Sequence, residues 1–360
     1  MIMKKLISII LGLAMSVGCL SMVAGCAGNN GNEETTVTVT DMVNTEVEVK
    51  KNPQKVACVS RTTYDLLIAF GLGDVIDGAY YSLLDNEWAE VFYPDSKNHY
   101  SYQYEESYET FYSRGVDLVL APEAYIADGL REHGITAITV CLYGKPNFDN
   151  YVYYFADLVK QLWGEREGVK EKVDLWKNKF AEAHTKIKTE LDKHSDTQRK
   201  LYYVRGDKNK GIGYTDNGQS FTEYAYKFLG FDFVGNRFET NRPSAEEICN
   251  VNPDVFVFGG IYQNTLIETI KTTEPYANLD AVKNNQLFNI PIGLTMFEQI
   301  SAFSPVFLYD QANKLYPDYF SFNVEQEVKN LSKTFFNVDL TDSEIYNMLH
   351  GLSREGNALA

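Results

Sequence analysis

Apolar and polar positions follow two different rhythms along this chain. Residues 36–50, "TVTVTDMVNTEVEVK", alternate between apolar and polar side chains on both sides of a polar turn, which is typical of a β-hairpin. Further along, short continuous apolar runs predict buried strands, and the segments between them, with apolar residues three or four apart, predict helices. Because strands and helices take turns, the pattern predicts parallel sheets covered by helices.

In the first half of the chain, apolar runs predict strands at residues 55–59, 75–79, 117–121 and 137–142. The segments between them predict helices at residues 108–114, 127–133 and 150–163. One more helix is expected after the first strand, with Thr62 as its N-terminal cap and its end at Gly71 to Gly73, because glycine favours helix C-termini. Together these elements predict an N-terminal α/β lobe over residues 36–163.

Residues 165–193 carry one apolar stripe between charged faces. The members of the stripe recur at steps of three, four or seven, which places them on one side of a helix: Val169, Val173, Trp176, Phe180, Ile187 and Leu191. We expect one long, stiff helix here, linking two lobes over residues 164–196.

After this helix the alternation resumes. Strands are predicted at residues 200–204, 254–258 and 287–290, and helices at residues 221–229, 264–272 and 304–316. Two more helices are expected towards residue 350, and residues 351–360 are expected to be frayed. The prediction is an α/β protein with a C-terminal lobe over residues 197–350, since the chain without its first 25 residues is long for a single hydrophobic core.

Residues 1–25 have the character of a secretory signal peptide. Lys4 and Lys5 precede a mostly apolar run, and small residues stand before Cys26. The run is also about long enough to span a bilayer, so a retained anchor is the alternative. The ending "VAGC" resembles a bacterial lipoprotein signal, which implies that Cys26 becomes lipidated. Residues 26–35 are polar and predict a flexible tether.

Charge narrows the range of partners. The formal net charge of −16 becomes −18 once Lys4 and Lys5 leave with the signal. Such a chain would repel nucleic acids and would gain nothing from an anionic membrane surface, so the lipid has to provide the anchor. The remaining cysteines, Cys58, Cys141 and Cys249, stand far apart in or beside apolar segments, which favours small buried side chains over a metal site.

An acid recurs at one distance before a strand in both halves. Glu109 stands eight positions before Asp117, and Glu246 stands eight positions before Asp254. Each glutamate is expected in the first turn of a short helix, where the helix dipole favours a carboxylate even without a further role. Glu247 is the alternative to Glu246 as the acid that points outward.

Several segments together resemble a known family. They are the opening "VTVTDMVNTEVEVKKNPQKVACVS", the paired "GVDLVLAP" and "NPDVFVFG", and the closing "AVKNNQLFNIP" and "SPVFLYDQANKLYPDYFS". Their content and order are similar to the substrate-binding lipoproteins of ABC importers for iron-siderophore complexes, haem and cobalamin. Val116 departs from the pattern, which has proline there. The resemblance implies two α/β lobes, each a mostly parallel sheet flanked by helices, joined by one long helix, with a ligand cleft between the lobes.

The resemblance also implies a role for the recurring acids. In this family each lobe presents an acid that pairs with arginines of the membrane permease, and Glu109 and Glu246 match those positions. One carboxylate per lobe suits a permease dimer and would fix the register of docking. The protein is then expected to be a monomer on the outer face of the bacterial cytoplasmic membrane, anchored through Cys26.

Candidate ligand residues follow from the predicted sheets, because ligands of open parallel sheets bind beyond the carboxyl ends of the strands. The side chains expected there are Arg61, Tyr81, Tyr125, Tyr143, Arg205, Tyr262 and Met296. Tyrosine offers a flat apolar face and a hydroxyl, and arginine suits anionic groups. A bulky metal chelate is therefore expected rather than a bare metal ion, although tyrosine also serves in cores and on surfaces.

The expected function is capture of a metal chelate, first of all a ferric siderophore, and its delivery to the permease. Haem or cobalamin is the alternative, with His99 as the candidate axial ligand. Neither a cofactor nor enzymatic activity is expected, since the sequence has no Gly-x-Ser-x-Gly elbow, Walker loop or His-Glu-x-x-His motif. A surface-anchored hydrolase and an adhesin are more distant alternatives. The tyrosine-rich residues 98–109 are expected to form a lid or a plain surface loop.

Overall fold

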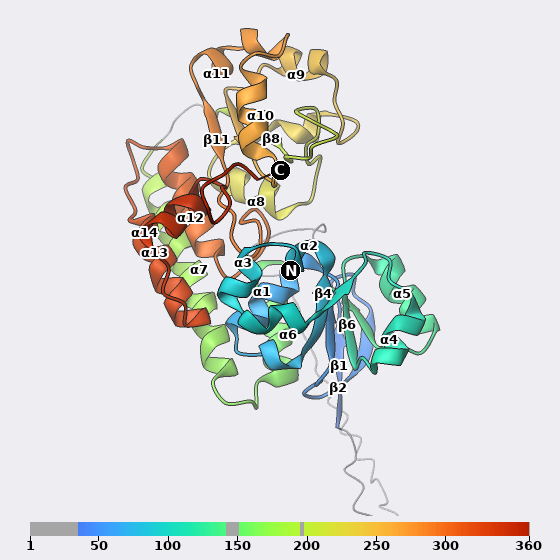
Figure 1. Cartoon of the computed structure of the whole chain (residues 1–360). Coiled ribbons are helices and arrows are strands. Elements are labelled where there is room, and N and C mark those ends of the chain that lie inside the picture. Colours follow the sequence, from blue (N-terminus) through green and yellow to red (C-terminus); the bar gives the residue numbers. More distant parts are fainter. Residues whose placement is uncertain (1–34, 142–150, 195–197, 360) are drawn as a thin grey trace, which may run out of the picture. The chain divides into compact units, whose positions relative to one another are not determined.

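Two parallel sheets, one in each half of the chain, organise the fold (Figure 1). The computed structural model describes residues 35–141, 151–194 and 198–359. The predicted signal peptide, Cys26 and Tyr143 lie outside the described residues. The chain from Thr35 onward forms a single unit, so the two lobes are parts of one body.

The first sheet has five strands in the order β5-β4-β3-β6-β7, and every pairing is parallel. Its strands are β3 (Val56–Cys58), β4 (Ile76–Tyr80), β5 (Tyr100–Tyr102), β6 (Leu118–Ala121) and β7 (Ala137–Thr139). The second sheet has four parallel strands in the order β11-β10-β8-β9. Its strands are β8 (Lys200–Val204), β9 (Asp232–Phe233), β10 (Val255–Phe258) and β11 (Leu287–Asn289). The predicted α/β class is confirmed.

Helices connect the strands much as the apolar spacing predicts, with several short ones added. The first half contains α1 (Arg61–Ala69), α2 (Tyr81–Leu84), α3 (Trp88–Phe92), α4 (Tyr108–Arg114), α5 (Ala124–Glu132) and α6 (Tyr154–Trp163). The second half contains α8 (Phe221–Phe228), α9 (Ala245–Val251), α10 (Gln263–Ile270), α11 (Asp280–Lys283), α12 (Ser304–Leu315), α13 (Val324–Leu331) and α14 (Asp342–Leu349). The predicted hairpin is also present, with β1 (Thr36–Thr40) antiparallel to β2 (Glu46–Lys50).

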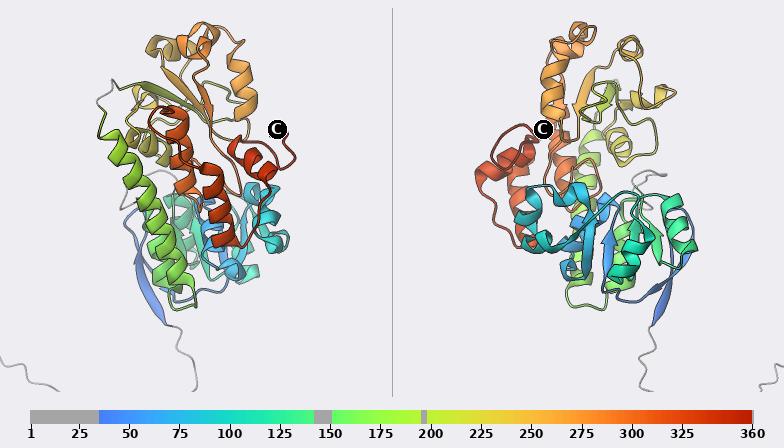
Figure 2. Two further views of the ribbon diagram at one scale, coloured as in Figure 1. Left: turned by 90° about the vertical axis from the view of Figure 1, so that its left-hand side faces the viewer. Right: turned by 45° about the vertical axis from the view of Figure 1, so that its right-hand side comes forward.

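The long helix α7 (Val169–Leu191) lies between the two halves in sequence and packs beside α12 (Figure 2). Its Trp176 ring lies 6.1 Å from Phe70 of the first half, and its Phe180 ring lies 6.4 Å from Phe221 of the second half. The length of the chain suggested two separate cores, but α7 joins the inner faces of both sheets into one hydrophobic cluster.

The outer face of each sheet has a smaller cluster of its own. Phe111 of α4 and Leu130 of α5 cover one face of the first sheet. Ile248 of α9 and Leu266 of α10 cover the outer face of the second sheet. The alternation of side chains along each strand explains the division, because successive residues of a strand point to opposite faces.

Two helix starts differ from the prediction. Thr62 is not a cap, because α1 already begins at Arg61, and the hydroxyl of Ser60 before it donates to Val140 O at 2.5 Å instead of capping the helix. The linking helix begins at Val169 rather than Glu165. Gly168 precedes it with φ +77°, a left-handed conformation that breaks the helical path and that the predicted helix overlooked.

Three further segments also differ. The expected lid or surface loop contains the edge strand β5, in which Tyr102 is fully buried and its hydroxyl donates to Asp77 Oδ2 at 2.6 Å. The helix predicted at residues 127–133 begins at Ala124. The tail is not frayed through residue 359, since Leu352 and Ala358 form a β-bridge. Among the described residues, the helices are all too short or too polar to cross a bilayer.

Candidate functional site

The recurring acids belong to two copies of one local structure, which we name the first cap unit (residues 107–117) and the second cap unit (residues 244–254). Ser107 Oγ accepts the Thr110 N–H at 3.3 Å in the first, and Ser244 Oγ accepts the Glu247 N–H at 3.2 Å in the second. Both helices have seven residues. A serine cap therefore sets the start of each helix at the same distance before the acid.

Each helix ends on a left-handed residue, Gly115 with φ +66° and Asn252 with φ +50°. Glycine and asparagine are the residues that adopt this conformation most readily at helix ends. Two positions later comes the aspartate that both copies share. The chain thus turns from helix to strand in the same way twice, with different residues at the turn.

The shared aspartates tie each unit to a neighbouring strand. Asp117 Oδ2 accepts the backbone N–H groups of Gln54 at 2.8 Å and Lys55 at 3.1 Å. Asp254 Oδ2 accepts the N–H of Lys200 at 2.7 Å. The eight-residue spacing therefore has a structural cause, since one helix and one turn separate the acid from the aspartate that fixes the unit.

Glu109 and Glu246 occupy the second position of their helices and are exposed. Neither carboxylate makes a hydrogen bond or ion pair with another residue of the described part of the chain. Glu247 is engaged differently, because its Oε2 accepts both the N–H and the hydroxyl of Ser244 at 2.7 Å. These bonds lower the pKa of Glu247 and assign it to the capping box. Glu246 is thus the acid left available for a partner.

Beyond the carboxyl ends of the first sheet lies a group that we name the tyrosine edge: Arg61, Tyr80, Tyr81, Tyr104 and Tyr125. The Arg61 guanidinium lies 4.7 Å from the centre of the Tyr80 ring, which is 4.6 Å from the Tyr81 ring and 6.1 Å from the Tyr104 ring. Three of the rings are exposed, Tyr81, Tyr104 and Tyr125. Predicted residues Arg61 and Tyr81 therefore meet, as strand-end residues should.

Two carboxylates hold the hydroxyls of this edge. Tyr104 donates to Glu123 Oε1 at 3.0 Å, and Tyr125 donates to Glu105 Oε1 at 2.5 Å. Burial and then the charge of Glu123 raise the pKa of Tyr104, and the hydrogen bond to Glu105 raises that of Tyr125. The phenols thus stay protonated and can offer flat faces and hydroxyl groups to a ligand.

Beyond the second sheet lies a different group, the cationic edge: Arg205, Lys208, Lys210, Arg242, Tyr214 and Tyr262. Around the Tyr214 ring, Lys210 Nζ lies at 4.1 Å, the Arg205 guanidinium at 4.8 Å and the Arg242 guanidinium at 5.9 Å. Lys208 Nζ lies 5.4 Å from the Tyr262 ring. Arg205 also pairs with Asp216 at 3.3 Å. This edge concentrates cations in a chain that is acidic as a whole.

Only part of these edges was predicted from the sequence. Arg205 and Tyr262 were predicted, whereas Tyr104, Lys210 and Tyr214 were not; they lie in the loops that follow β5 and β8. The stretch "RGDKNK", directly after a buried strand, carries three cations and was the available signal. Predicted Met296 is half-buried in the segment between β11 and α12, where it forms a β-bridge with Ile292.

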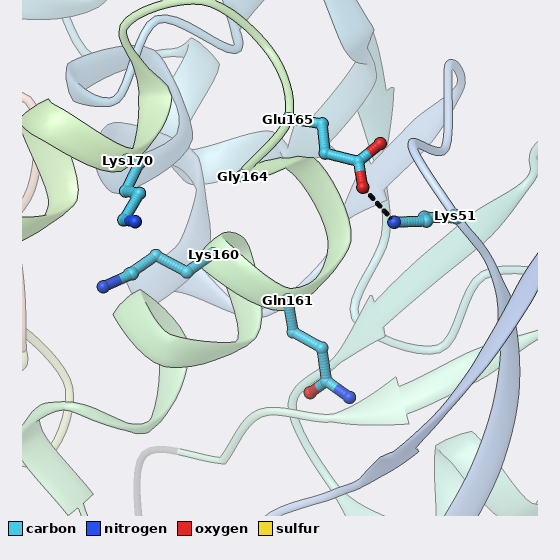
Figure 3. A pocket seen from close by; sticks show the side chains of 6 residues that line it. All are labelled: Lys51, Lys160, Gln161, Gly164, Glu165 and Lys170. Carbon is cyan, nitrogen blue, oxygen red and sulfur yellow. Dashed lines mark hydrogen bonds and ion pairs between the residues drawn. The ribbon is translucent and has the colours of Figure 1, made fainter.

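The described residues also form a pocket of about 320 Å³ at the junction of β2, α6 and α7 (Figure 3). Lys51 pairs there with Glu165, and Lys160 pairs with Asp174 at 2.7 Å. None of the predicted ligand residues lines it. Lys170 also lines the pocket, and Gln161 of its lining donates to Thr38 O of the hairpin at 3.0 Å, so the pocket lies where the hairpin packs against α6.

Two parallel sheets and one long helix between them agree with the two-lobed α/β fold that the resemblance implies. The comparisons agree. The family model described as periplasmic binding protein matches residues 117–292, just under half of the chain. The chain is similar to the ABC transporter substrate-binding lipoprotein YvrC of Bacillus subtilis, with 22% identity over 83% of this chain and 94% of that protein.

A second relative is the Fe(3+)-citrate-binding protein YfmC of Bacillus subtilis, with 28% identity over 47% of this chain and 54% of that protein. Among solved structures, the molybdate periplasmic binding protein MolA of Haemophilus influenzae has a TM-score of 0.70 and 16% identity, over 85% of this chain and 99% of that one. The structural likeness shows the fold. Together these matches show that the chain is similar to substrate-binding proteins of the periplasmic binding protein class, in agreement with the resemblance found in the sequence.

Proposed function

We propose that this protein captures an anionic ferric chelate outside the cell and delivers it to the permease of an ABC importer. The observation that carries the proposal is the duplicated cap unit, which exposes one unpaired carboxylate, Glu109 or Glu246, from each lobe. The similarity to a substrate-binding lipoprotein and to a ferric-citrate-binding protein supports the class of cargo.

Docking explains why the cap unit occurs twice. Two like acids on like helices would meet two like sites on a permease dimer, and a monomer of this protein would bridge them. Exposed charges of this kind fix register and speed encounter more than they add affinity. The structural role of each acid is small, since a carboxylate in the first helical turn contributes only about 0.3–1 kcal/mol.

The chemistry of the two edges suits an anionic chelate. Arg205, Lys210 and Arg242 can neutralise carboxylate, catecholate or hydroxamate groups, and the tyrosine rings can cover the apolar parts of a ligand. Residues Arg61, Tyr81, Tyr125, Tyr143, Arg205, Tyr262 and Met296 remain the proposed ligand contacts. A siderophore or ferric citrate fits this set, and the metal enters as cargo.

His99 is the residue that bears on the haem alternative. Its Nδ1 lies 2.9 Å from the Tyr64 hydroxyl, and its ring stacks on Tyr93 at 5.4 Å. Burial lowers the pKa of His99 to about 4. The Nδ1 contact leaves Nε2 of a neutral ring as the atom that could bind a metal, so haem stays the alternative to a ferric chelate.

Thermal unfolding with added chelates tests the capture step. A ligand that binds only the folded state raises the melting temperature in a concentration-dependent way. We expect ferric citrate or a ferric hydroxamate to do so, with metal-free citrate and haem as comparisons. If ferric chelates leave the melting temperature unchanged while a chromogenic ester is turned over, the surface-hydrolase alternative replaces this proposal.

The proposed location on the outer face of the membrane depends on Cys26. Wild-type cells grown with labelled palmitate should incorporate the label into this protein, whereas Cys26→Ser should not and should release the protein into the medium. Label retained by Cys26→Ser would contradict lipidation at this residue.

A further inference from the structure

Glu298, in the segment between β11 and α12, lies close to Arg205 of the cationic edge. It is buried, and its Oε1 accepts the Gly260 N–H at 2.8 Å and the Tyr203 hydroxyl at 3.4 Å. Its Oε2 is buried too, and no described residue offers it a hydrogen bond. A buried carboxylate with one unsatisfied oxygen is costly in its charged form, so this position needs an explanation.

The loops above Glu298 are packed without spare room. A Cβ on Gly206 would lie 1.8 Å from Gly259 O, and one on Gly260 would lie 2.4 Å from Arg205 O. Glycines therefore bring the ends of β8 and β10 into backbone contact. Because Glu298 holds Gly260 directly, it also fixes the position from which Arg205 leaves the sheet.

The charges that face Glu298 come from several elements. Arg205 and Asp216, from the segment after β8, act on it in opposite directions, and Tyr203 of β8 and Tyr226 of α8 lie close enough to interact. Asp310 of α12 acts on the same Tyr226. Burial is the largest effect and raises the pKa of Glu298 to about 7. The group thus changes charge near neutral pH.

We propose that Glu298 is a positioning residue that couples capture of an anionic ligand at Arg205 to uptake of one proton from solvent. An anion on the cationic edge offsets the positive charge of Arg205 and adds negative charge above the carboxylate. The neutral acid is then favoured. By reciprocity, protonated Glu298 favours the bound anion, so affinity falls as the pH rises above about 7.

The inference rests on the proposed function, since it assumes an anionic ligand, and calorimetry with ferric citrate tests it. Titrations in two buffers of different ionisation enthalpy give the number of protons taken up per chelate bound. We expect Glu298→Gln to take up fewer protons than the wild type near pH 7, by up to about one. Its affinity should be nearly independent of pH, because glutamine keeps the acceptor for Gly260 N–H.

Asp65→Asn is the matched control. Asp65 is the other buried carboxylate whose pKa burial raises to about 7, and it bonds to Ala302 N rather than to the cationic edge. This variant should take up the same number of protons as the wild type, and subtraction between variants removes the titration of citrate itself.

The outcomes separate the two proposals. If wild-type protein binds no ferric chelate at any pH, the proposed function fails. If it binds ferric citrate with the same proton uptake as Glu298→Gln, only the present inference fails. Should Glu298→Gln not fold, a wild-type affinity that stays constant between pH 6 and pH 8 still overturns it.

Discussion

The two cap units are nearly identical, whereas the two strand-end edges are opposites. Both units place a serine cap, an exposed glutamate and an anchoring aspartate at the same spacing. In the tyrosine edge, tyrosine hydroxyls donate hydrogen bonds to Glu105 and Glu123. In the cationic edge, lysine and arginine side chains surround the Tyr214 ring. Two like cap units suit a partner with two equivalent sites, and two different edges suit a ligand whose two faces differ.

Charge reversal at both acids should have the largest effect. Glu109→Arg combined with Glu246→Arg places like charges against the arginines expected on the permease, and such contacts cost several kcal/mol, enough to lower chelate uptake by more than about tenfold. Chelate affinity in solution should not change. Uptake of iron-labelled citrate by cells measures the loss of transport, and calorimetry measures the affinity for the chelate.

Glu325→Arg is the control for this double variant. Glu325 is exposed and also stands at the second position of its helix, α13, so its reversal carries the same helix-dipole cost. Cells that carry this variant should take up the chelate as fast as cells that carry the wild type. Normal uptake by the double variant would show that the cap units do not dock.

Two buried carboxyl groups whose pKa burial raises to about 7 extend the comparison, because each half contributes one, Asp65 and Glu298. Desolvation raises the folded-state pKa of Asp65 to about 7 from its ordinary 3.8. Its contribution to stability is therefore fully present below pH 3.8 and is lost as the pH rises through 7. Asp65→Asn should abolish this loss of stability, which amounts to a few kcal/mol because a pKa difference of one unit corresponds to about 1.4 kcal/mol.

Urea unfolding at several pH values measures the effect. Between pH 5 and pH 8, the free energy of unfolding of the variant should rise relative to that of the wild type. Some dependence of stability on pH should remain in the variant, because Glu298 still titrates. Parallel pH profiles for the two proteins would mean that Asp65 does not titrate in this range.

The anchoring aspartates should differ in strength. Asp117→Ala removes the acceptor of two exposed backbone N–H groups, and Asp254→Ala removes the acceptor of one, so at about 1 kcal/mol per bond we expect losses of about 2 and about 1 kcal/mol in the free energy of unfolding. Equal losses, measured by urea unfolding, would show that the second bond of Asp117 contributes nothing.

The helix ends should give the smallest effect. Gly115→Asn copies the residue that the second cap unit uses at the same place and should change stability by less than about 0.5 kcal/mol. Gly115→Ala has open space around its Cβ but keeps φ +66°, so it should cost about 1 kcal/mol. If both variants cost the same, the left-handed conformation is not what selects the residue.

Much of the fold was predictable because its strands are continuous apolar runs bounded by turn residues. The spacing of Glu109 and Glu246 was readable for the same reason, since local caps and turns set it. The start of α7 was not predicted, although Gly168 in the sequence is a residue that often interrupts helices. The prediction followed the spacing of the apolar residues instead. The edge strand β5 was missed because tyrosines mask its alternation.

The ligand edges were only half predictable. The strand-end rule finds the residue that follows each strand, such as Arg61 and Arg205. It does not find a residue that a loop brings back to the strand end, such as Tyr214. Nor does it find a buried group from a distant segment, such as Glu298. These depend on tertiary packing that no local pattern records.

Binding of the protein to membrane vesicles that carry its permease tests the central claim most directly. If two like units meet two like sites, Glu109→Arg and Glu246→Arg should each weaken binding by a similar factor, while Glu325→Arg binds as the wild type does. Loss from one single variant with none from the other would contradict the equivalence of the two units.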